Sequence, residues 1–479
     1  MSFDDLRGFI AAAEALGELQ RLDGAHWDLE IGALTEIQAE RRGPALLFDR
    51  IADYPPGYRV LANGFATARR TALALNLPLD LGPVELANCW RTRLKEFHKV
   101  PPVEVSAAPV LQNVRRGRDV DLGQFPTPRW HEKDGGRYLA TGCAVVVRDP
   151  DEGWVNLGTY RGQVQGPDRL SLLIVQGKHA RIMLNKYHAR GEPCPVAVSL
   201  GHDPALFAAA TLPVPWGVSE YDFVGWLKGA PVPITRGPYT DLPIPATAEI
   251  VLEGEIPPLT EESCDEGPFG EWPGYYAGIH KREQAVVPVL RVHTVLHRDA
   301  PIILGSPPLK PPRPYAFAFP RTVPLVWDEL ERAGCTGITG VWQLATYFGL
   351  FLVVRIQQQY AGHAKQVGLA ATCVRSAAYA GKWVVVVDDD IDIANPGEVF
   401  WAMGTRCNVD NVDVVRGVWT SPADPALPDE VRATGNPVSS RIIVDACRPY
   451  GKPFPAANVF DTAYKQQIAA KWGIPYGRA

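Results

Sequence analysis

Hydrophobic and polar positions alternate with a helical period in the first part of the chain. This spacing predicts helices over 3–21, 66–77 and 83–98, the first with Ser2 as its N-terminal cap. Ala45–Phe48 is predicted to be a short apolar strand. Together these elements predict a small α/β domain over residues 1–115. The prolines around its end indicate a linker: Pro101, Pro102, Pro109, Pro126 and Pro128.

From residue 116 to residue 310 the pattern changes to short apolar runs separated by Gly, Pro and Asp. The runs expected to form strands are Ala140–Val147, Leu170–Val175, Val196–Leu200, Ala248–Leu252 and Val286–Val295. Short helices are predicted at Pro204–Ala210 and at Glu220–Leu227, where Ser219 is a typical N-cap. This part of the chain is therefore predicted to be a β-rich barrel or sandwich.

Residues 311–479 show helix and strand patterns in alternation. They follow the proline-rich stretch 301–320, which we expect to be a rigid extended loop. Helices are predicted at Leu325–Ala333, Ala364–Ala380 and Pro396–Met403, strands at Val353–Arg355 and Trp383–Val387, and a mixed segment at Gly337–Leu344. The alternation predicts an α/β domain with a mainly parallel sheet, followed by a C-terminal helix at Val459–Trp472.

Composition narrows the class of protein. The chain has 479 residues, 46% hydrophobic and 21% charged, as expected for a globular protein of several domains. Its net charge of -5 gives no electrostatic case for nucleic acid or an anionic membrane as a partner. No apolar run approaches the roughly 20 residues of a membrane span. The eight cysteines form no C-x-x-C pair, and the N-terminus lacks the pattern of a signal peptide, so we expect a cytoplasmic protein.

Three residues far apart in the sequence offer ligands that a hard divalent cation prefers. Asn156 carries a neutral oxygen, His179 a ring nitrogen, and Glu220 a carboxylate at the start of a predicted helix. Two oxygens and one nitrogen suit Mn²⁺ or Mg²⁺ better than zinc or copper. Taken singly, each residue also fits an ordinary place in a turn, loop or helix start. The sequence leaves open whether the three converge.

Two carboxylates flank a tight turn later in the chain. Glu266 and Glu271 enclose Gly-Pro-Phe-Gly, a sequence that excludes a continuous helix and that can aim both side chains into one cavity. Arg161, with its planar charge, can lie between them and bind a carboxylate. Such a pair can hold one carboxylate ionised and the other protonated. The alternative is a solvated acidic loop.

A set of motifs along the chain resembles one known family. The motifs are N-x-G-T-Y-R (156–161), G-K-H (177–179), P-x-G-V-S-E-Y (215–221), P-A-x-A-E-I-V-L-E-G (245–254) and E-G-P-x-G-E (266–271). Later motifs are G-H-A-K-Q (362–366), V-V-x-D-D-D-I-D (385–392) and W-A-x-x-T-R (401–406). In this order, and over nearly the whole chain, they resemble the UbiD-like decarboxylases.

The resemblance implies a fold, cofactors and residue roles. The implied fold is a mixed α+β and α/β multidomain protein, with a split β-barrel flavin-binding domain between an N-terminal α/β segment and a C-terminal α/β domain used for oligomerisation. The implied cofactors are prenylated FMN, Mn²⁺ and K⁺, with Asn156, His179 and Glu220 as metal ligands. The residues implied to surround the flavin are Thr159, Tyr160, Arg161, the strand Leu173–Val175 (Leu173, Ile174 and Val175), Lys178, His179, Pro213 and Lys382.

The resemblance also implies a reaction, namely reversible non-oxidative decarboxylation of an unsaturated or aromatic acid. Loss of CO₂ from an sp² carbon needs an electron sink, which the cofactor supplies. Arg161 would position the carboxylate, Glu271 would deliver the proton, and Glu266 would hold Arg161. The alternatives are a decarboxylase of acrylic or aliphatic α,β-unsaturated acids, an oxidoreductase with plain FMN, and a non-catalytic assembly subunit.

The partners and the substrate are less defined. We expect a small carboxylic acid and CO₂ as reactants, a prenyl-flavin synthase as the source of the cofactor, and a homodimer or homohexamer. An aromatic or heteroaromatic acid is favoured. In the proline-rich stretch, Lys310 or Arg313 would hold a second anionic group of the substrate, and Tyr315 or Phe317 would wall a flat ring. An exposed charge or a packing aromatic is the alternative at each position.

Overall fold

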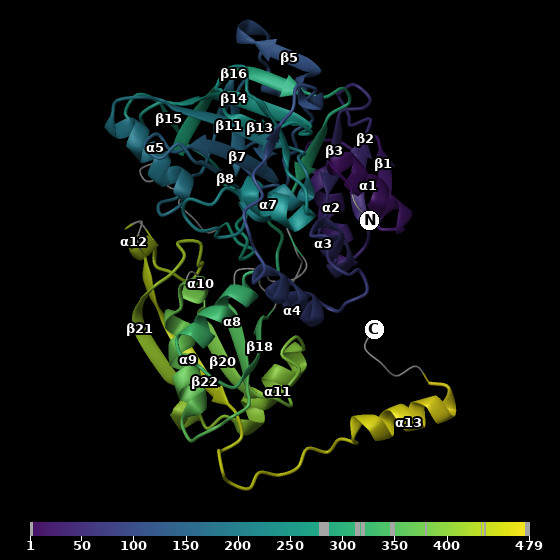
Figure 1. Cartoon of the computed structure of the whole chain (residues 1–479), viewed down its shortest axis with the longest axis vertical. Helices are drawn as coiled ribbons and strands as arrows, with labels where there is room; N and C mark the ends of the chain where they lie inside the picture. The colour runs from purple at the N-terminus through teal and green to yellow at the C-terminus, as the bar shows by residue number, and fades with distance from the viewer. Residues whose placement is uncertain are drawn as a thin grey trace. The chain divides into compact units, whose positions relative to one another are not determined.

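The chain folds into two compact units. The structure, a computed structural model, describes residues 3–276, 287–311, 317, 321–344, 350–378, 381–432, 434 and 437–474. The first unit comprises Met1–Leu79, Trp90–Arg321 and Thr420–Pro437, and the second comprises Asp80–Cys89, Thr322–Trp419 and Val438–Ala479 (Figure 1). None of the described helices is long and apolar enough to cross a membrane.

A four-stranded sheet forms the N-terminal part of the first unit, in the order β1-β2-β3-β17. Its strands are β1 (Leu19–Asp23), β2 (Ala45–Asp49), β3 (Arg59–Ala62) and β17 (Ile302–Gly305). The helices along this part of the chain are α1 (Leu6–Ala15), α2 (Glu30–Glu40) and α3 (Ala68–Ala74), and α4 (Pro83–Leu94) begins in the second unit and ends in the first. β17 is buried and pairs in parallel with β3, so the loop predicted over 301–320 is wrong at its start.

The first helix is shorter than predicted. It ends at Ala15, and Gly17 follows with φ of +71°, a conformation that glycine adopts without strain. Leu19–Asp23, which continues the helical pattern, instead pairs in parallel with β2. Asp5 caps the helix by accepting from the Gly8 N–H, while the predicted cap, Ser2, lies outside the described residues. Strand pairing across the fold therefore overrides the local period.

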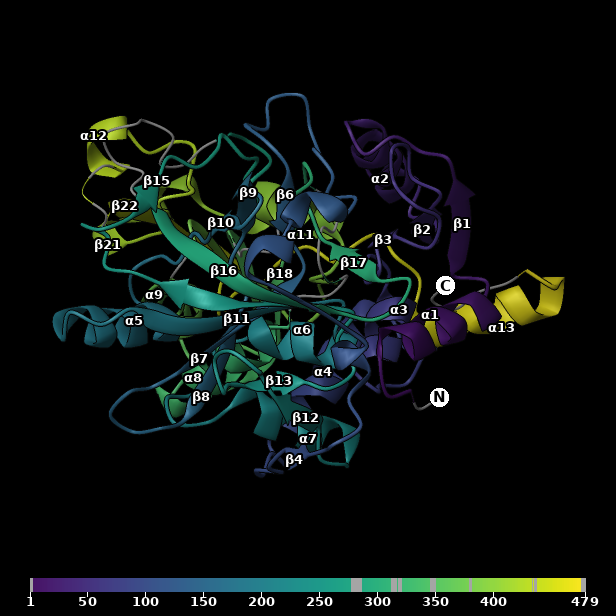
Figure 2. The same ribbon diagram turned by 90° about the horizontal axis from the view of Figure 1, so that it is seen from above.

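A ten-stranded sheet forms the centre of the first unit. Eight strands follow in the order β6-β9-β10-β16-β14-β11-β7-β8, and β5 and β15 pair with β16. In Figure 1, β16, β14, β11, β7 and β8 follow one another downward, and Figure 2 shows the long β16 crossing the sheet. The bounds are β5 (Asn113–Arg116), β6 (Tyr138–Ala140), β7 (Cys143–Arg148), β8 (Val155–Gly158), β9 (Gly162–Gly166), β10 (Arg169–Ser171), β11 (Cys194–Leu200), β14 (Ile250–Ile256), β15 (Ser263–Cys264) and β16 (Val287–His297).

Helices and a small sheet complete this unit. The helices are α5 (His179–Ala189), α6 (Pro204–Ala210), α7 (Glu220–Lys228) and the short α12 (Asp429–Arg432). The small sheet contains β4 (Val103–Glu104), β12 (Pro233–Arg236) and β13 (Pro243–Pro245). α6 matches its predicted bounds, and Ser219 caps α7 as predicted by accepting from the Tyr221 N–H.

One predicted strand in the centre is wrong. Of Leu170–Val175, only Leu170 and Ser171 belong to β10. Leu172 donates to the Pro288 carbonyl, Leu173 to the Arg161 carbonyl, and Ile174 to the Leu172 carbonyl two residues back. The chain therefore turns after Ser171, and Leu173–Val175 is irregular although its composition favours a strand.

The second unit is an α/β domain. Its sheet has the order β18-β19-β20-β22-β21, and β19, β20 and β22 are parallel, as predicted. The strands are β18 (Ile338–Gln343), β19 (Phe351–Ile356), β20 (Trp383–Asp388), β21 (Asp413–Trp419) and β22 (Val438–Ala446), and the helices are α8 (Val323–Arg332), α9 (His363–Cys373), α10 (Arg375–Ala378), α11 (Pro396–Arg406) and α13 (Thr462–Trp472). The helix predicted over Ala364–Ala380 breaks at Val374, whose backbone is extended.

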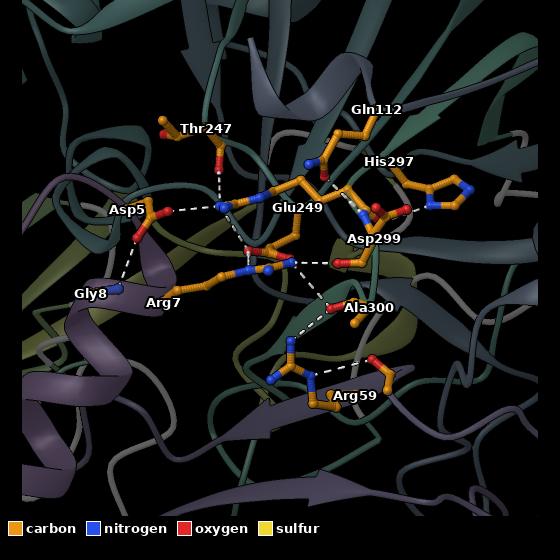
Figure 3. Close-up of polar contacts among 12 residues, drawn as sticks. Asp5, Arg7, Gly8, Arg59, Gln112, Thr247, Glu249, His297, Asp299 and Ala300 are labelled. Carbon is orange, nitrogen blue, oxygen red and sulfur yellow. Dashed lines mark hydrogen bonds and ion pairs between the residues drawn. The ribbon is translucent and has the colours of Figure 1, made fainter.

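A buried cluster of charges ties α1 to the central sheet (Figure 3). Glu249, which precedes β14, is fully buried and accepts two hydrogen bonds of 2.8 Å from Arg7 of α1. Arg298, which follows β16, donates to Asp5 at 2.7 Å and to Glu249 at 3.3 Å. Arg7 also donates to the Asp299 carbonyl at 2.7 Å. The cluster therefore joins the N-terminal helix to the ends of two central strands.

Candidate active site

Arg161 lies between two glutamates, as the motifs predict. It follows β8 and directly precedes β9, whereas Glu266 and Glu271 lie on the turn after β15. The Arg161 Nε and Nη2 donate to the two oxygens of Glu266 at 2.7 and 2.8 Å, and Nη1 donates to Glu271. Glu266 is thus held by both oxygens and Glu271 by one, so the two glutamates are not equivalent.

The turn that carries both glutamates packs closely on the segment after His131. The Gly135 N–H donates to the Pro268 carbonyl at 2.7 Å, and a Cβ on Gly135 would lie 1.9 Å from the Gly267 oxygen. Gln163 of β9 accepts from the Gly267 N–H at 3.0 Å. Only glycine permits the close approach at residue 135. The turn is therefore fixed from two sides.

Burial and charge separate the roles of the two carboxylates. The side chain of Glu266 is 1% exposed and that of Glu271 is 16% exposed. Burial raises the pKa of Glu271, the ion pair with Arg161 opposes this, and the charge of Glu266 adds to it. Although burial lowers the pKa of Arg161, Glu271 and Glu266 hold it above its usual value. One cation shared by two carboxylates thus leaves Glu271 able to keep a proton.

The three predicted metal ligands lie on segments that the structure brings together. Asn156 is in β8, Glu220 is the first residue of α7, and His179 is the first residue of α5. Glu220 accepts from the Leu157 N–H at 2.6 Å, which ties α7 to β8. Burial and the charge of Glu220 raise the pKa of Tyr160, and a hydrogen bond from the Ala180 backbone opposes this. The hydroxyl of Tyr160 therefore lies near the starts of α5 and α7.

These residues fit a hard cation. Asn156 is buried, its amide nitrogen makes no close hydrogen bond in the described part of the chain, and its oxygen is the end of the amide that can ligate a cation. Burial raises the pKa of Glu220 to about 8, which a bound cation would offset. The His179 ring makes edge contacts with Trp154 and Trp216, with centroids 5.8 and 5.2 Å away. In the described part of the chain, no three His, Cys, Asp or Glu side chains are placed to hold a metal, so the site would depend on the Asn156 amide.

The residues predicted to surround a flavin are mostly close to Arg161 in the fold. Thr159 and Tyr160 precede it, and the Thr159 N–H donates to the Ala210 carbonyl at 3.2 Å. Leu173 bonds to the Arg161 carbonyl, and Ile174 and Val175 follow in irregular structure. Lys178 is the residue directly before α5 and is exposed.

Two further residues of this set differ from the rest. Pro213 is exposed after α6. Lys382 belongs to the second unit, at the residue before β20, so the structure does not place it against Arg161. The assignment of Lys382 to a cofactor phosphate stays a prediction.

In the proline-rich stretch, the structure places two of the four candidate residues. Phe317 is 1% exposed and stacks on Phe65 and Phe207, with Arg321 3.8 Å from its centroid, so it is a packing aromatic here. Lys310 is exposed, and its Cα would lie 3.1 Å from a Cβ at Gly274, three residues beyond Glu271. Arg313 and Tyr315 lie outside the described residues.

The motifs do not include the residues beneath the glutamates. Tyr138 of β6 stacks on Phe269, and Asp134 accepts from the Tyr276 hydroxyl at 2.9 Å. The local signal for them is Asp134-Gly135-Gly136, a turn composition directly before an apolar strand.

Models of three protein domains match the chain in sequence order. They are the N-terminal, Rift-related and C-terminal domains of 3-octaprenyl-4-hydroxybenzoate carboxy-lyase, over residues 10–90, 102–311 and 316–446. These three ranges cover most of the chain.

Individual relatives agree with these models over nearly their full lengths. A phenolic acid decarboxylase of Streptomyces sp. (strain D7) is 34% identical, with 94% of this chain and 93% of the relative covered. A pyrrole-2-carboxylic acid decarboxylase of Pseudomonas aeruginosa is 31% identical, with 98% and 97% covered. Among solved structures, the UbiD-class enzyme HmfF of Pelotomaculum thermopropionicum in complex with FMN superposes with a TM-score of 0.83 at 28% identity, covering 98% of this chain and 100% of HmfF. An evolved dimeric form of HmfF, in complex with prFMN, superposes with a TM-score of 0.78 at 27% identity, covering 97% of this chain and 100% of that one.

Proposed function

The chain belongs to the UbiD family and is a carboxy-lyase of the predicted mixed multidomain fold, and we propose that it reversibly decarboxylates an aromatic or heteroaromatic acid with prenylated FMN. The two relatives named above act, by their names, on phenolic and pyrrole-2-carboxylic acids, which supports this substrate class. The FMN and prFMN complexes of HmfF support the cofactor.

The observation that carries the proposal is that Arg161 makes more hydrogen bonds to Glu266 than to Glu271. Glu266 fixes the guanidinium with two hydrogen bonds, whereas Glu271 makes one and lies at a partly open position. A substrate carboxylate drawn to Arg161 therefore competes with Glu271 and not with Glu266. Release from the ion pair removes the interaction that lowers the pKa of Glu271, so substrate binding favours the protonated form of that carboxyl.

This exchange gives each residue a step in the reaction. Arg161 orients the carboxylate that leaves, and Glu266 keeps Arg161 in place. The bound prenylated flavin supplies the sink for the electron pair left when CO₂ departs. Glu271, protonated while substrate occupies Arg161, delivers its proton to the carbon that lost CO₂. The resulting carboxylate can then return to the Arg161 Nη1.

The cofactor phosphate end is assigned to the second cluster. Asn156, His179 and Glu220 would hold Mn²⁺, with K⁺ beside it, and Lys178 would add positive charge for the phosphate. Backing for this assignment comes from the buried Asn156 amide and the raised pKa of Glu220. The assignment of Lys382 to the phosphate stays a prediction. A prenyl-flavin synthase would supply the cofactor. The chain would consist of the domains 1–115, 116–310 and 311–479 and would act as a homodimer or homohexamer.

The test is to produce the protein together with a prenyl-flavin synthase and to identify its flavin by mass spectrometry and absorption. CO₂ release is then measured against phenolic, pyrrole, furan, indole and acrylic acids. Prenylated FMN with CO₂ release from one aromatic or heteroaromatic acid supports the proposal. CO₂ release from acrylic acids alone would assign the chain to the alternative substrate class. Plain FMN bound despite the synthase would favour an oxidoreductase.

A further inference from the structure

The segment Asp134–Tyr138 forms a platform under the Glu266–Glu271 turn. The close approach of Gly135 to Gly267 and Pro268 fixes the middle of the turn. At its far end, Asp134 accepts from the Tyr276 hydroxyl at 2.9 Å and holds the chain beyond Glu271. Tyr138, the last residue of the segment and the first of β6, is fully buried.

The ring of Tyr138 acts on Arg161 through one intervening side chain. It stacks on Phe269, with ring centroids 3.9 Å apart and planes at 30°. The guanidinium carbon of Arg161 in turn lies 5.5 Å from the centroid of Phe269. Aromatic pairs and cation–π contacts of this kind hold side chains in one orientation. Phe269 is therefore fixed by Tyr138 and supports Arg161.

The hydroxyl of Tyr138 reaches the turn through Gln163, to which it donates. Burial, together with the charge of the nearby Glu266, raises the pKa of Tyr138, so the hydroxyl stays protonated. The same hydroxyl lies 3.5 Å from Oε1 of Gln163, which accepts from the Gly267 N–H at 3.0 Å. The hydroxyl thus lies at the start of the turn, and the ring lies under its middle.

We propose that Tyr138 is a positioning residue for proton delivery, because its hydroxyl reaches the turn through Gln163, its ring holds Phe269, and through both it sets the place of Arg161 relative to Glu271. This inference rests on the proposed function, in which Glu271 is the proton donor. Loss of the hydroxyl leaves the negative charge of Glu266 less well compensated. Glu271 then holds its proton more tightly.

Kinetics of the holoenzyme test the proposal with a matched pair of variants. Tyr138→Phe removes the hydroxyl and keeps the ring, and Tyr58→Phe makes the same change at a half-buried tyrosine outside the site. For Tyr138→Phe we expect kcat to fall about tenfold, within the range known for small misplacements of catalytic groups. KM should stay nearly constant, and the alkaline limb of the kcat profile should move up by about half a pH unit or more. Tyr58→Phe should match wild type. An unchanged kcat and pH profile in Tyr138→Phe would overturn the proposal.

Backbone hydrogen exchange provides a readout independent of activity. In the purified full-length protein, peptides that cover 263–276 should exchange severalfold faster in Tyr138→Leu, and less so in Tyr138→Phe, while peptides from β20 stay unchanged. Wild-type exchange in this turn for both variants would contradict the positioning role. Failure of the proposed function would show differently, as wild-type holoenzyme that releases no CO₂, with the turn still loosened in Tyr138→Leu.

Discussion

Two buried clusters of arginine and glutamate in the first unit differ in their charge balance. Around Glu249, the carboxylates of Glu249 and Asp5 meet the guanidinium groups of Arg7 and Arg298 (Figure 3). Around Arg161, one guanidinium meets the two carboxylates of Glu266 and Glu271.

The balance decides what each cluster can do. At Glu249 every carboxylate has an arginine, and Arg7 also binds a backbone carbonyl, so the cluster joins α1 to the sheet. At Arg161 the second carboxylate is only partly compensated, and its pKa is raised. A buried ion pair therefore indicates neither stability nor catalysis by itself. The ratio of positive to negative groups distinguishes the two clusters.

The largest expected effect comes from removing the proton at the Arg161 cluster. Glu271→Gln keeps the size of the side chain and cannot deliver a proton, so kcat should fall by about 10²–10⁴-fold. Flavin and metal content should be unchanged by mass spectrometry. Glu262→Gln is the matched control, because Glu262 is paired with Arg169 and Arg291 outside the site. Turnover close to wild type in Glu271→Gln would end its assignment as proton donor.

The corresponding change at the structural cluster should act on stability alone. Glu249→Ala leaves Arg7 and Arg298 without their buried partner and should lower the free energy of unfolding by about 3–5 kcal/mol. The measurement is urea unfolding followed by fluorescence, with CO₂ release per folded molecule as the second readout. A stable variant with impaired kcat would reverse the roles assigned to the two clusters.

A third variant gives the structural cluster the charge ratio of the Arg161 cluster. Arg298→Gln leaves Arg7 alone with Glu249 and Asp5, and we expect a loss of about 1–3 kcal/mol near neutral pH. Urea unfolding measures this loss. A variant as stable as wild type would show that charge balance at Glu249 does not stabilise the fold.

The smallest expected effect is a shift in pH dependence, caused by removing one of the two negative charges at the Arg161 cluster. Glu266→Gln removes the like charge that raises the pKa of Glu271, so the alkaline limb of kcat should move to lower pH by about one unit or less. The shift is opposite in sign to that expected for Tyr138→Phe. A pH series of initial CO₂ release rates measures it, and movement of the limb to higher pH would contradict the electrostatic account.

Local signals account for the elements that the sequence predicts correctly. α6 begins with Pro204 after the cap Asp203, and α7 begins after the cap Ser219, so both starts are encoded within a few residues. α5 has no side-chain cap at Lys178 and was not predicted. Leu173–Val175 has strand composition but lacks a pairing partner, which depends on residues far away in the sequence.

The residues of the candidate site also divide into those that the sequence displays and those that depend on contacts far away in the sequence. Arg161, Glu266 and Glu271 lie in motifs that the sequence displays, and the structure brings them together. Tyr138 and Gly135 contact Phe269 and Gly267, more than 130 residues away, so the local turn composition before β6 does not reveal these contacts. The roles of Asn156, His179 and Glu220 stay predictions, although their segments meet at Tyr160.

Exchange of a product hydrogen tests most directly whether Glu271 transfers the proton. The decarboxylated product is incubated in D₂O with holoenzyme and without CO₂, and deuterium at the carbon that bore the carboxylate is followed by NMR. The account predicts exchange with wild type and with Glu262→Gln, and a loss of at least about 10²-fold in Glu271→Gln. Exchange at the wild-type rate in Glu271→Gln would contradict it.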